Sequence, residues 1–143
     1  MTRKSQIGFL AILLVAIVAT LFLVILPTTA QQTPDQVVQE FYTWYIDYAQ
    51  SANPLVDKAY RSATNLAPAF VAQMDDFTSR PMMFDPILCA QDVPTSISTM
   101  DTVIDGSTAT VHVETSFPGH AFDVRLARDG KTWQITDVIC AVP

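Results

Sequence analysis

An apolar stretch near the N-terminus constrains this chain more than any other feature. Ile7 to Leu26 is a run of twenty residues without a charged side chain, and Arg3 and Lys4 precede it. A helix of that length rises 1.5 Å per residue and spans a hydrocarbon core about 30 Å thick. Positively charged residues stay on the cytoplasmic side of such segments. We therefore predict one transmembrane helix in the cell membrane, with a cytoplasmic N-terminus and the rest of the chain on the extracytoplasmic side.

The alternative interpretation is a cleavable signal peptide. Thr28-Thr29-Ala30 is a passable small-residue cleavage site. The apolar core of a signal peptide usually has only about 7–15 residues, so the length favours an uncleaved anchor. Both interpretations export the remainder. We divide the chain into residues 1–30, a cytoplasmic tip and anchor, and residues 34–143, an extracytoplasmic domain in the periplasm or at the cell surface.

The exported part is acidic and long enough for one hydrophobic core. After residue 30 it holds six basic and fourteen acidic residues, a net charge of −8. Such a surface repels phosphate backbones, so nucleic acid is not an expected partner. It also offers no polybasic patch for anionic lipid.

The first helix of the domain is predicted to begin at Thr33-Pro34-Asp35-Gln36, which combines a candidate N-cap, a proline in the first turn and a capping box. It continues to about Ser51. Its apolar side chains fall on one face at helical spacing. The residues of that face are Val37, Val38, Phe41, Trp44, Tyr45, Tyr48 and Ala52. A short helical piece over about 54–60 and a third helix over about 65–78 are expected to follow, and then a proline-rich loop over 79–96.

Beyond residue 96 the apolar pattern alternates with a period of two, which is typical of half-buried strands. Turn dipeptides at Asp105-Gly106, Pro118-Gly119 and Asp129-Gly130 divide this region at hairpin spacing. The predicted strands are 97–104, 108–116, 121–128 and 131–140. We therefore predict an α+β domain in which two to three helices pack on one side of a four-stranded antiparallel sheet.

The two cysteines, Cys89 and Cys140, favour a disulfide because an even pair in an exported domain usually forms one. Two separately buried thiols are the alternative. A metal site is less favoured, because neither cysteine has a nearby histidine at ligand spacing.

The order of elements resembles the cone-shaped fold of the nuclear-transport-factor-2-like superfamily, which includes ketosteroid isomerase, and more narrowly an uncharacterised group of exported bacterial domains. Three motifs carry the resemblance: Val38-x-x-Phe41-Tyr42-x-Trp44-Tyr45, Asp85-Pro86-Ile87-Leu88-Cys89-Ala90-Gln91-Asp92 and Trp133-x-Ile135-x-Asp137-x-Ile139-Cys140. The resemblance implies a curled, cone-like sheet and a bond between Cys89 and Cys140. It implies no activity.

No catalytic, cofactor-binding or metal-binding residue can be assigned from the sequence. We expect His112 and His120 to be solvated surface residues, and Asp85 and Asp92 to cap turns beside prolines. The carboxylates lack the spacing of a calcium loop. We therefore predict that the protein is not an enzyme and uses no cofactor.

The functional prediction is a membrane-anchored binding or assembly module, a non-catalytic accessory subunit of a membrane protein complex. Its expected partners are the lipid bilayer, through residues 7–26, and other subunits of that complex. An apolar small-ligand carrier or sensor that uses the cone interior is the alternative, and an isomerase-type enzyme is a third possibility. Aromatic residues would line the pocket of such a carrier: Phe41, Tyr42, Trp44, Tyr45, Tyr48 and Trp133.

Overall fold

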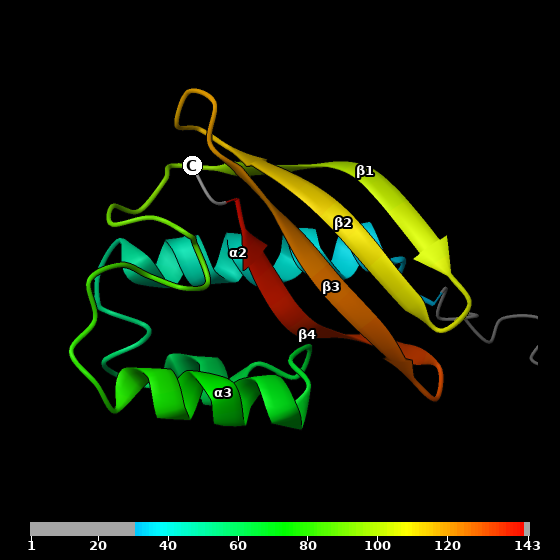
Figure 1. Ribbon diagram of the computed structural model, residues 1–143, viewed down its shortest axis with the longest axis horizontal. Helices are drawn as coiled ribbons and strands as arrows, with labels where there is room; N and C mark the ends of the chain where they lie inside the picture. The colour runs from blue at the N-terminus through cyan, green and yellow to red at the C-terminus, as the bar shows by residue number, and fades with distance from the viewer. Residues whose placement is uncertain (1–30, 142–143) are drawn as a thin grey trace, which may run out of the picture. The chain divides into compact units, whose positions relative to one another are not determined.

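The computed structural model describes residues 31–141, and the predicted anchor at residues 7–26 lies outside them. In order along the chain, the described elements are α2 (Pro34–Ala49), the 3-10 helix η1 (Ala59–Ser62), α3 (Pro68–Thr78), β1 (Ile97–Asp105), β2 (Thr108–Thr115), β3 (Ala121–Asp129) and β4 (Thr132–Cys140) (Figure 1). This confirms the predicted α+β class. Within residues 31–141 no helix has the length and hydropathy to cross a membrane.

The four strands form one antiparallel sheet in the order β1-β2-β3-β4. Each hairpin turn has a glycine in the left-handed region at the place where the sequence predicts one, for example Gly106 at φ 58° and Gly130 at φ 59°. Val111, Val124 and Val138 lie opposite one another across three strands. Their side chains point to the inner face of the sheet, where Val111 and Val124 are buried in the core and the partly buried Val138 packs against it.

Helix α2 covers that face, packing against β1, β2 and β4. It begins as the sequence predicts, because the Gln36 side chain accepts a hydrogen bond from the Thr33 N–H at 3.0 Å and Pro34 occupies the first turn. The buried face is rotated from the predicted one. Tyr42 and Ile46 are buried, whereas Trp44 and Tyr48 lie at the edge of the contact. The buried face is therefore shifted toward Tyr42, which packs against Phe122 of β3 and donates a hydrogen bond to the Ile87 carbonyl.

Helix α3 packs against β4, and the segment before it protects the outer edge of that strand. The Ile135 N–H donates to the Asn65 carbonyl at 2.8 Å, and the Ala67 N–H donates to the Ile135 carbonyl at 2.9 Å. Leu66 forms a parallel bridge with Ile135 and is buried. The segment therefore satisfies backbone groups that an edge strand would otherwise expose.

A β-bulge in β4 changes which side chains of that strand face inward. Leu126 pairs with Ile135, but the preceding Arg125 pairs with Asp137, so Thr136 is an extra residue. Strict alternation from Ile135 would turn Cys140 to the outer face. The extra residue reverses the alternation, so Cys140 lies opposite the buried Phe122 on the inner face.

Candidate binding site

The loop between α3 and β1 is organised around the carboxyl group of Asp85. Its Oδ1 accepts the N–H of Ile87 at 2.8 Å and that of Leu88 at 3.1 Å. The backbones of Asp85 and Ala90 then pair as a short antiparallel bridge. Asp85 therefore caps a turn beside Pro86, as the sequence predicts. We refer to residues 85–90 as the capped loop.

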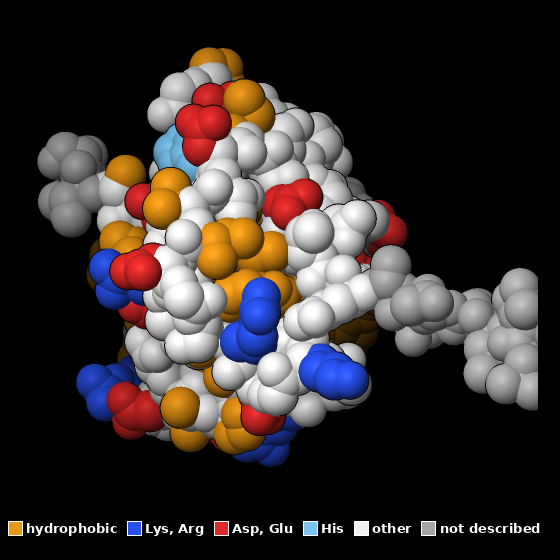
Figure 2. All heavy atoms as spheres, turned by 90° about the vertical axis from the view of Figure 1, so that its right-hand side faces the viewer, with side chains coloured by type: hydrophobic (Ala, Val, Ile, Leu, Met, Phe, Trp, Pro, Cys, Tyr) orange, Lys and Arg blue, Asp and Glu red, His pale blue; other side chains and the backbone are white. Residues whose placement is uncertain are grey.

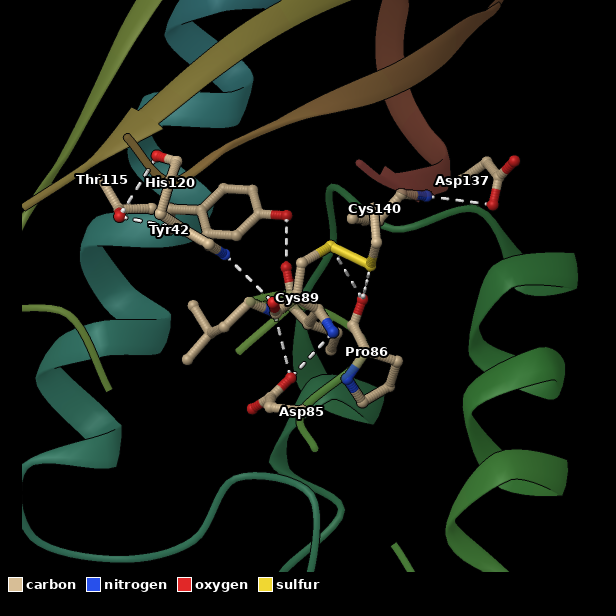
Figure 3. The surroundings of a disulfide bond; sticks show 11 residues. Tyr42, Asp85, Pro86, Cys89, Thr115, His120, Asp137 and Cys140 are labelled. Carbon is tan, nitrogen blue, oxygen red and sulfur yellow. Dashed lines mark hydrogen bonds between the residues drawn. A yellow bond between two sulfur atoms is a disulfide. The ribbon is translucent and has the colours of Figure 1, made fainter. Parts of the chain in front are cut away.

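Three other parts of the fold hold the capped loop in place (Figure 3). From α2, the Tyr42 O–H donates to the Ile87 carbonyl at 2.8 Å. From the turn between β2 and β3, Nε2 of His120 lies 3.0 Å from the Cys89 carbonyl oxygen. From β4, Cys140 forms a disulfide with Cys89, with their Cα atoms 5.3 Å apart. The disulfide prediction is confirmed, and the loop is fixed from three directions.

His120 is the residue whose role the sequence did not predict. We expected a solvated turn residue, but its ring is half-buried, with Phe117 and Phe122 edge-on at 6.1 and 6.0 Å between ring centroids. Its Nδ1 lies 3.0 Å from the hydroxyl of Thr115. No sequence pattern links position 120 to position 89, because the contact depends on how the hairpin folds over the loop.

The other histidine behaves as expected. His112 lies on the outer face of the sheet, where its Nδ1 is 2.8 Å from Oδ1 of Asp123 and both side chains are well exposed. Among residues 31–141, no three His, Cys, Asp or Glu side chains are placed to hold a metal ion.

Asp85 also pairs with a tyrosine. The Tyr45 O–H donates to Oδ2 of Asp85 at 2.7 Å. Burial raises the pKa of the Asp85 carboxyl, although the hydrogen bonds from Tyr45 and the backbone oppose that rise. Burial, and next the negative charge of Asp85, raise the pKa of the Tyr45 hydroxyl, so this phenol stays protonated. All three donors to the carboxyl come from the fold itself, which makes Asp85 a structural group of the loop.

An open cleft of about 290 Å³ lies beside the capped loop, at the C-terminal end of α2. Its floor is apolar and includes the buried Leu55 and Leu88. Met83, Phe84 and Val93 line it with exposed side chains, and that of Met83 is 84% exposed. The complete lining is Ala49, Ala52, Asn53, Pro54, Leu55, Met82, Met83, Phe84, Asp85, Leu88, Gln91, Asp92 and Val93. The cleft thus joins a fixed loop to an exposed apolar rim.

The predicted pocket residues do not come together around this cleft. Phe41, Tyr42, Tyr45 and Trp133 are buried in the core, where Phe41 packs against both tyrosines at 5.2 and 5.7 Å between ring centroids. Trp44 and Tyr48 instead line a shallow depression on the outer side of α2, together with Glu40, Thr43 and Asp47. The aromatic residues of α2 thus form two groups: one is buried in the core, and the other lies at the surface.

The opposite end of the domain has a different surface. Figure 2 shows that end, where hydrophobic side chains gather between acidic and basic ones. The lining of the cleft, in contrast, contains no lysine or arginine. The charged residues that line the cleft are therefore all acidic, whereas the opposite end carries both acidic and basic side chains.

No family model and no curated protein matches this chain. Among solved structures, a chain in the crystal structure of the type VI native effector-immunity complex Tae3-Tai3 from Ralstonia pickettii has a similar fold, with a TM-score of 0.64. The two chains are 23% identical, and the match covers 78% of this chain and 98% of the other. At this identity the likeness concerns the fold and does not extend to function.

This match overturns the resemblance to the nuclear-transport-factor-2-like superfamily. The structural similarity is to a chain from an effector-immunity complex, and no family model supports the superfamily. The physical reason is that the resemblance depended on the order of helices and hairpins and on aromatic motifs that prove to be core residues. Such features determine which elements form, and different families share them.

Proposed function

We propose that this protein is an extracytoplasmic protein-binding module, held at the membrane by residues 7–26, that acts as an accessory subunit and not as an enzyme. The length of the apolar N-terminal segment supports the proposed attachment to the membrane. The charge of −8 on the exported part supports a protein partner over nucleic acid or anionic lipid.

One observation carries the proposal: a rigid loop stands beside an exposed apolar cleft. Hydrogen bonds from Tyr42 and Tyr45 and the disulfide at Cys89 fix the loop before any partner arrives. Preorganisation of this kind raises affinity because little conformational entropy is lost on binding. Exposed methionine and aromatic side chains such as Met83 and Phe84 are enriched where proteins meet.

The structural neighbour gives independent support. Its fold occurs in a complex of two proteins, an effector and an immunity protein. A partner that is itself a protein is therefore consistent with this fold.

The position of the carboxyl groups also favours binding over catalysis. An isomerase-type site needs a carboxylate or histidine free to reach a substrate. Asp85 is a half-buried carboxyl that faces a tyrosine, and the turn and Tyr45 already occupy its oxygens. We therefore assign Asp85 to the architecture of the loop.

Site-specific photocrosslinking in the native host tests the proposal. A benzoyl-phenylalanine photocrosslinker replaces Met83 in the full chain, and a second version carries it at Met100, an exposed methionine on β1. Irradiated membranes are then separated by denaturing electrophoresis. We expect a discrete protein adduct from Met83 and none from Met100. Absence of an adduct from both positions would refute a protein-binding role.

The membrane address is tested separately. Alkaline carbonate strips peripheral proteins, so the full chain should remain in the membrane pellet if residues 7–26 span the bilayer. A variant that replaces residues 1–30 with a cleavable export signal should be released in soluble form. Extraction of the full chain by carbonate would contradict the anchor.

A further inference from the structure

We infer that the cleft beside the capped loop binds a segment of the protein partner in which a bulky apolar side chain lies next to a lysine or arginine. This inference rests on the proposed function and assigns the site and its chemistry. The cleft unites an apolar floor, an adaptable apolar rim and the exposed carboxylate of Asp92. The apolar parts and the carboxylate each select one part of the ligand.

The apolar part follows from the floor and the rim. Leu55 and Leu88 close the bottom of the cleft, and Met83, with its flexible thioether, stands at the rim. A volume of about 290 Å³ lies at the lower limit for small-ligand pockets, which usually begin at about 300 Å³. The cleft therefore suits one large side chain of a peptide better than a complete small molecule.

The basic part follows from the charges. Asp85 and Asp92 line the cleft, and no lysine or arginine does. The oxygens of Asp85 already accept hydrogen bonds from Tyr45 and the turn, so the exposed Asp92 is the carboxylate that a ligand can reach. The Asp–Arg pairs among residues 31–141 use other carboxylates, namely Asp75, Asp76 and Asp137. A cation that enters the cleft can therefore pair with Asp92, which forms none of these ion pairs. The acidic domain as a whole also attracts a basic segment from a distance.

The same charges disfavour two other occupants. A second copy of this chain would bring another acidic domain, so the two would repel each other. The surface of an anionic bilayer would be repelled for the same reason. A basic protein segment is the occupant that satisfies both the apolar and the acidic parts of the site.

A random seven-residue peptide library displayed on phage provides the probe. The full chain, purified in mild detergent, serves as the bait, and the peptides that it enriches are measured by fluorescence anisotropy. We expect enriched peptides to carry Lys or Arg within two positions of Leu, Ile, Phe or Trp. Their affinity should fall as salt rises, because the Asp92 carboxylate is exposed to solvent.

Two matched pairs of variants locate the site. Asp92→Asn should weaken binding about fivefold, the upper range for an exposed ion pair, whereas Asp101→Asn on β1 makes the same charge change and should leave it unaltered. Met83→Ser should weaken binding about tenfold, because the ligand loses an apolar contact at the rim, whereas Met100→Ser should have no effect. All four positions are exposed, so each variant should keep the wild-type melting temperature.

Three outcomes would overturn the inference: enrichment of peptides without a cation, equal binding by Asp92→Asn and wild type, or no enrichment on the wild-type chain. These failures are distinct from failure of the proposed function. A crosslinked adduct from Met100 together with no peptide binding at the cleft would leave a protein-binding module whose partner docks elsewhere.

Discussion

The two edges of the sheet are built differently. At one edge, residues 65–67 cover part of β4 with backbone hydrogen bonds, and a disulfide joins the end of the strand to the capped loop. At the other edge, β1 pairs only with β2 among the described strands. Its side chains Met100, Val103 and Ile104 are each more than half exposed.

This difference predicts that substitutions at the two edges affect different properties, namely stability at one edge and association at the other. The β4 edge is partly covered and cross-linked, so changes at the covered residues should alter the free energy of unfolding. The exposed side chains at the β1 edge bury little surface. A bulge between Thr99 and Thr102 together with the exposed Asp101 makes this edge unsuitable for uncontrolled strand pairing. Changes there should alter association and leave stability nearly unchanged.

The largest expected effect comes from removing the cross-link at the β4 edge. The double variant Cys89→Ser/Cys140→Ser should lose about 4 kcal/mol of unfolding free energy, because the disulfide closes a loop of 51 residues in the unfolded chain. Urea unfolding followed by tryptophan fluorescence measures the loss. Reduction of the wild type is the control and should give a similar value. Equal urea midpoints for the oxidised wild type and the variant would show that the disulfide does not stabilise the β4 edge.

The second effect compares one apolar side chain from each edge. Leu66→Ala removes a buried side chain beside β4 and should cost about 3 kcal/mol, since a cavity remains. Val103→Ala on β1 removes an exposed side chain and should change stability by less than about 0.5 kcal/mol. Both are measured by urea unfolding. Similar costs for the two variants would show that the β1 edge is as firmly built as the β4 edge.

A smaller, pH-dependent effect is expected at Asp85. Its pKa is raised in the fold, so its contribution to stability is fully present below the unfolded pKa of about 3.9 and is lost as the pH rises through the folded value. The unfolding free energy of the wild type should therefore fall relative to that of Asp85→Asn as the pH increases from about 4. Unfolding curves for both proteins between pH 3.5 and 7 test this. A difference that shifts in favour of the wild type would reverse the assigned sign.

The smallest effect on stability is expected at the β1 edge. Asp101→Val removes a charge that opposes strand pairing, so the variant should self-associate at high protein concentration while its unfolding free energy changes by less than about 0.5 kcal/mol. Light scattering measures the association. Asp105→Val, at the end of the same strand, is the matched control and should associate less. A monomeric Asp101→Val variant would show that this charge does not protect the edge.

The sequence predicts the elements of this domain well, because their signals are local. The capping residues at Thr33 and Gln36 and the glycines of the hairpin turns mark boundaries that lie within a few residues of those observed. The Asp-Pro pair at 85–86 likewise predicts a capped turn, since the interacting atoms are two or three residues apart.

The candidate site is less predictable because its contacts join distant residues. The cleft combines the end of α2 with a proline-rich loop that has no period of its own. The contact of His120 with Cys89 spans 31 residues and depends on the curvature of a hairpin. The buried face of α2 also differs from the predicted stripe, because contacts of Tyr42 with β3 and with the capped loop determine which side of the helix is buried.

The bulge at Thr136 has a consequence for the maturation of the chain. Cys140 reaches Cys89 only when the last strand has paired with β3 in the native register, since alternation without the extra residue turns its thiol to the outer face. A chain with a slipped strand therefore keeps two free thiols, whereas a correctly paired chain can be oxidised. The disulfide therefore preserves, as a covalent bond, the register in which the sheet was assembled.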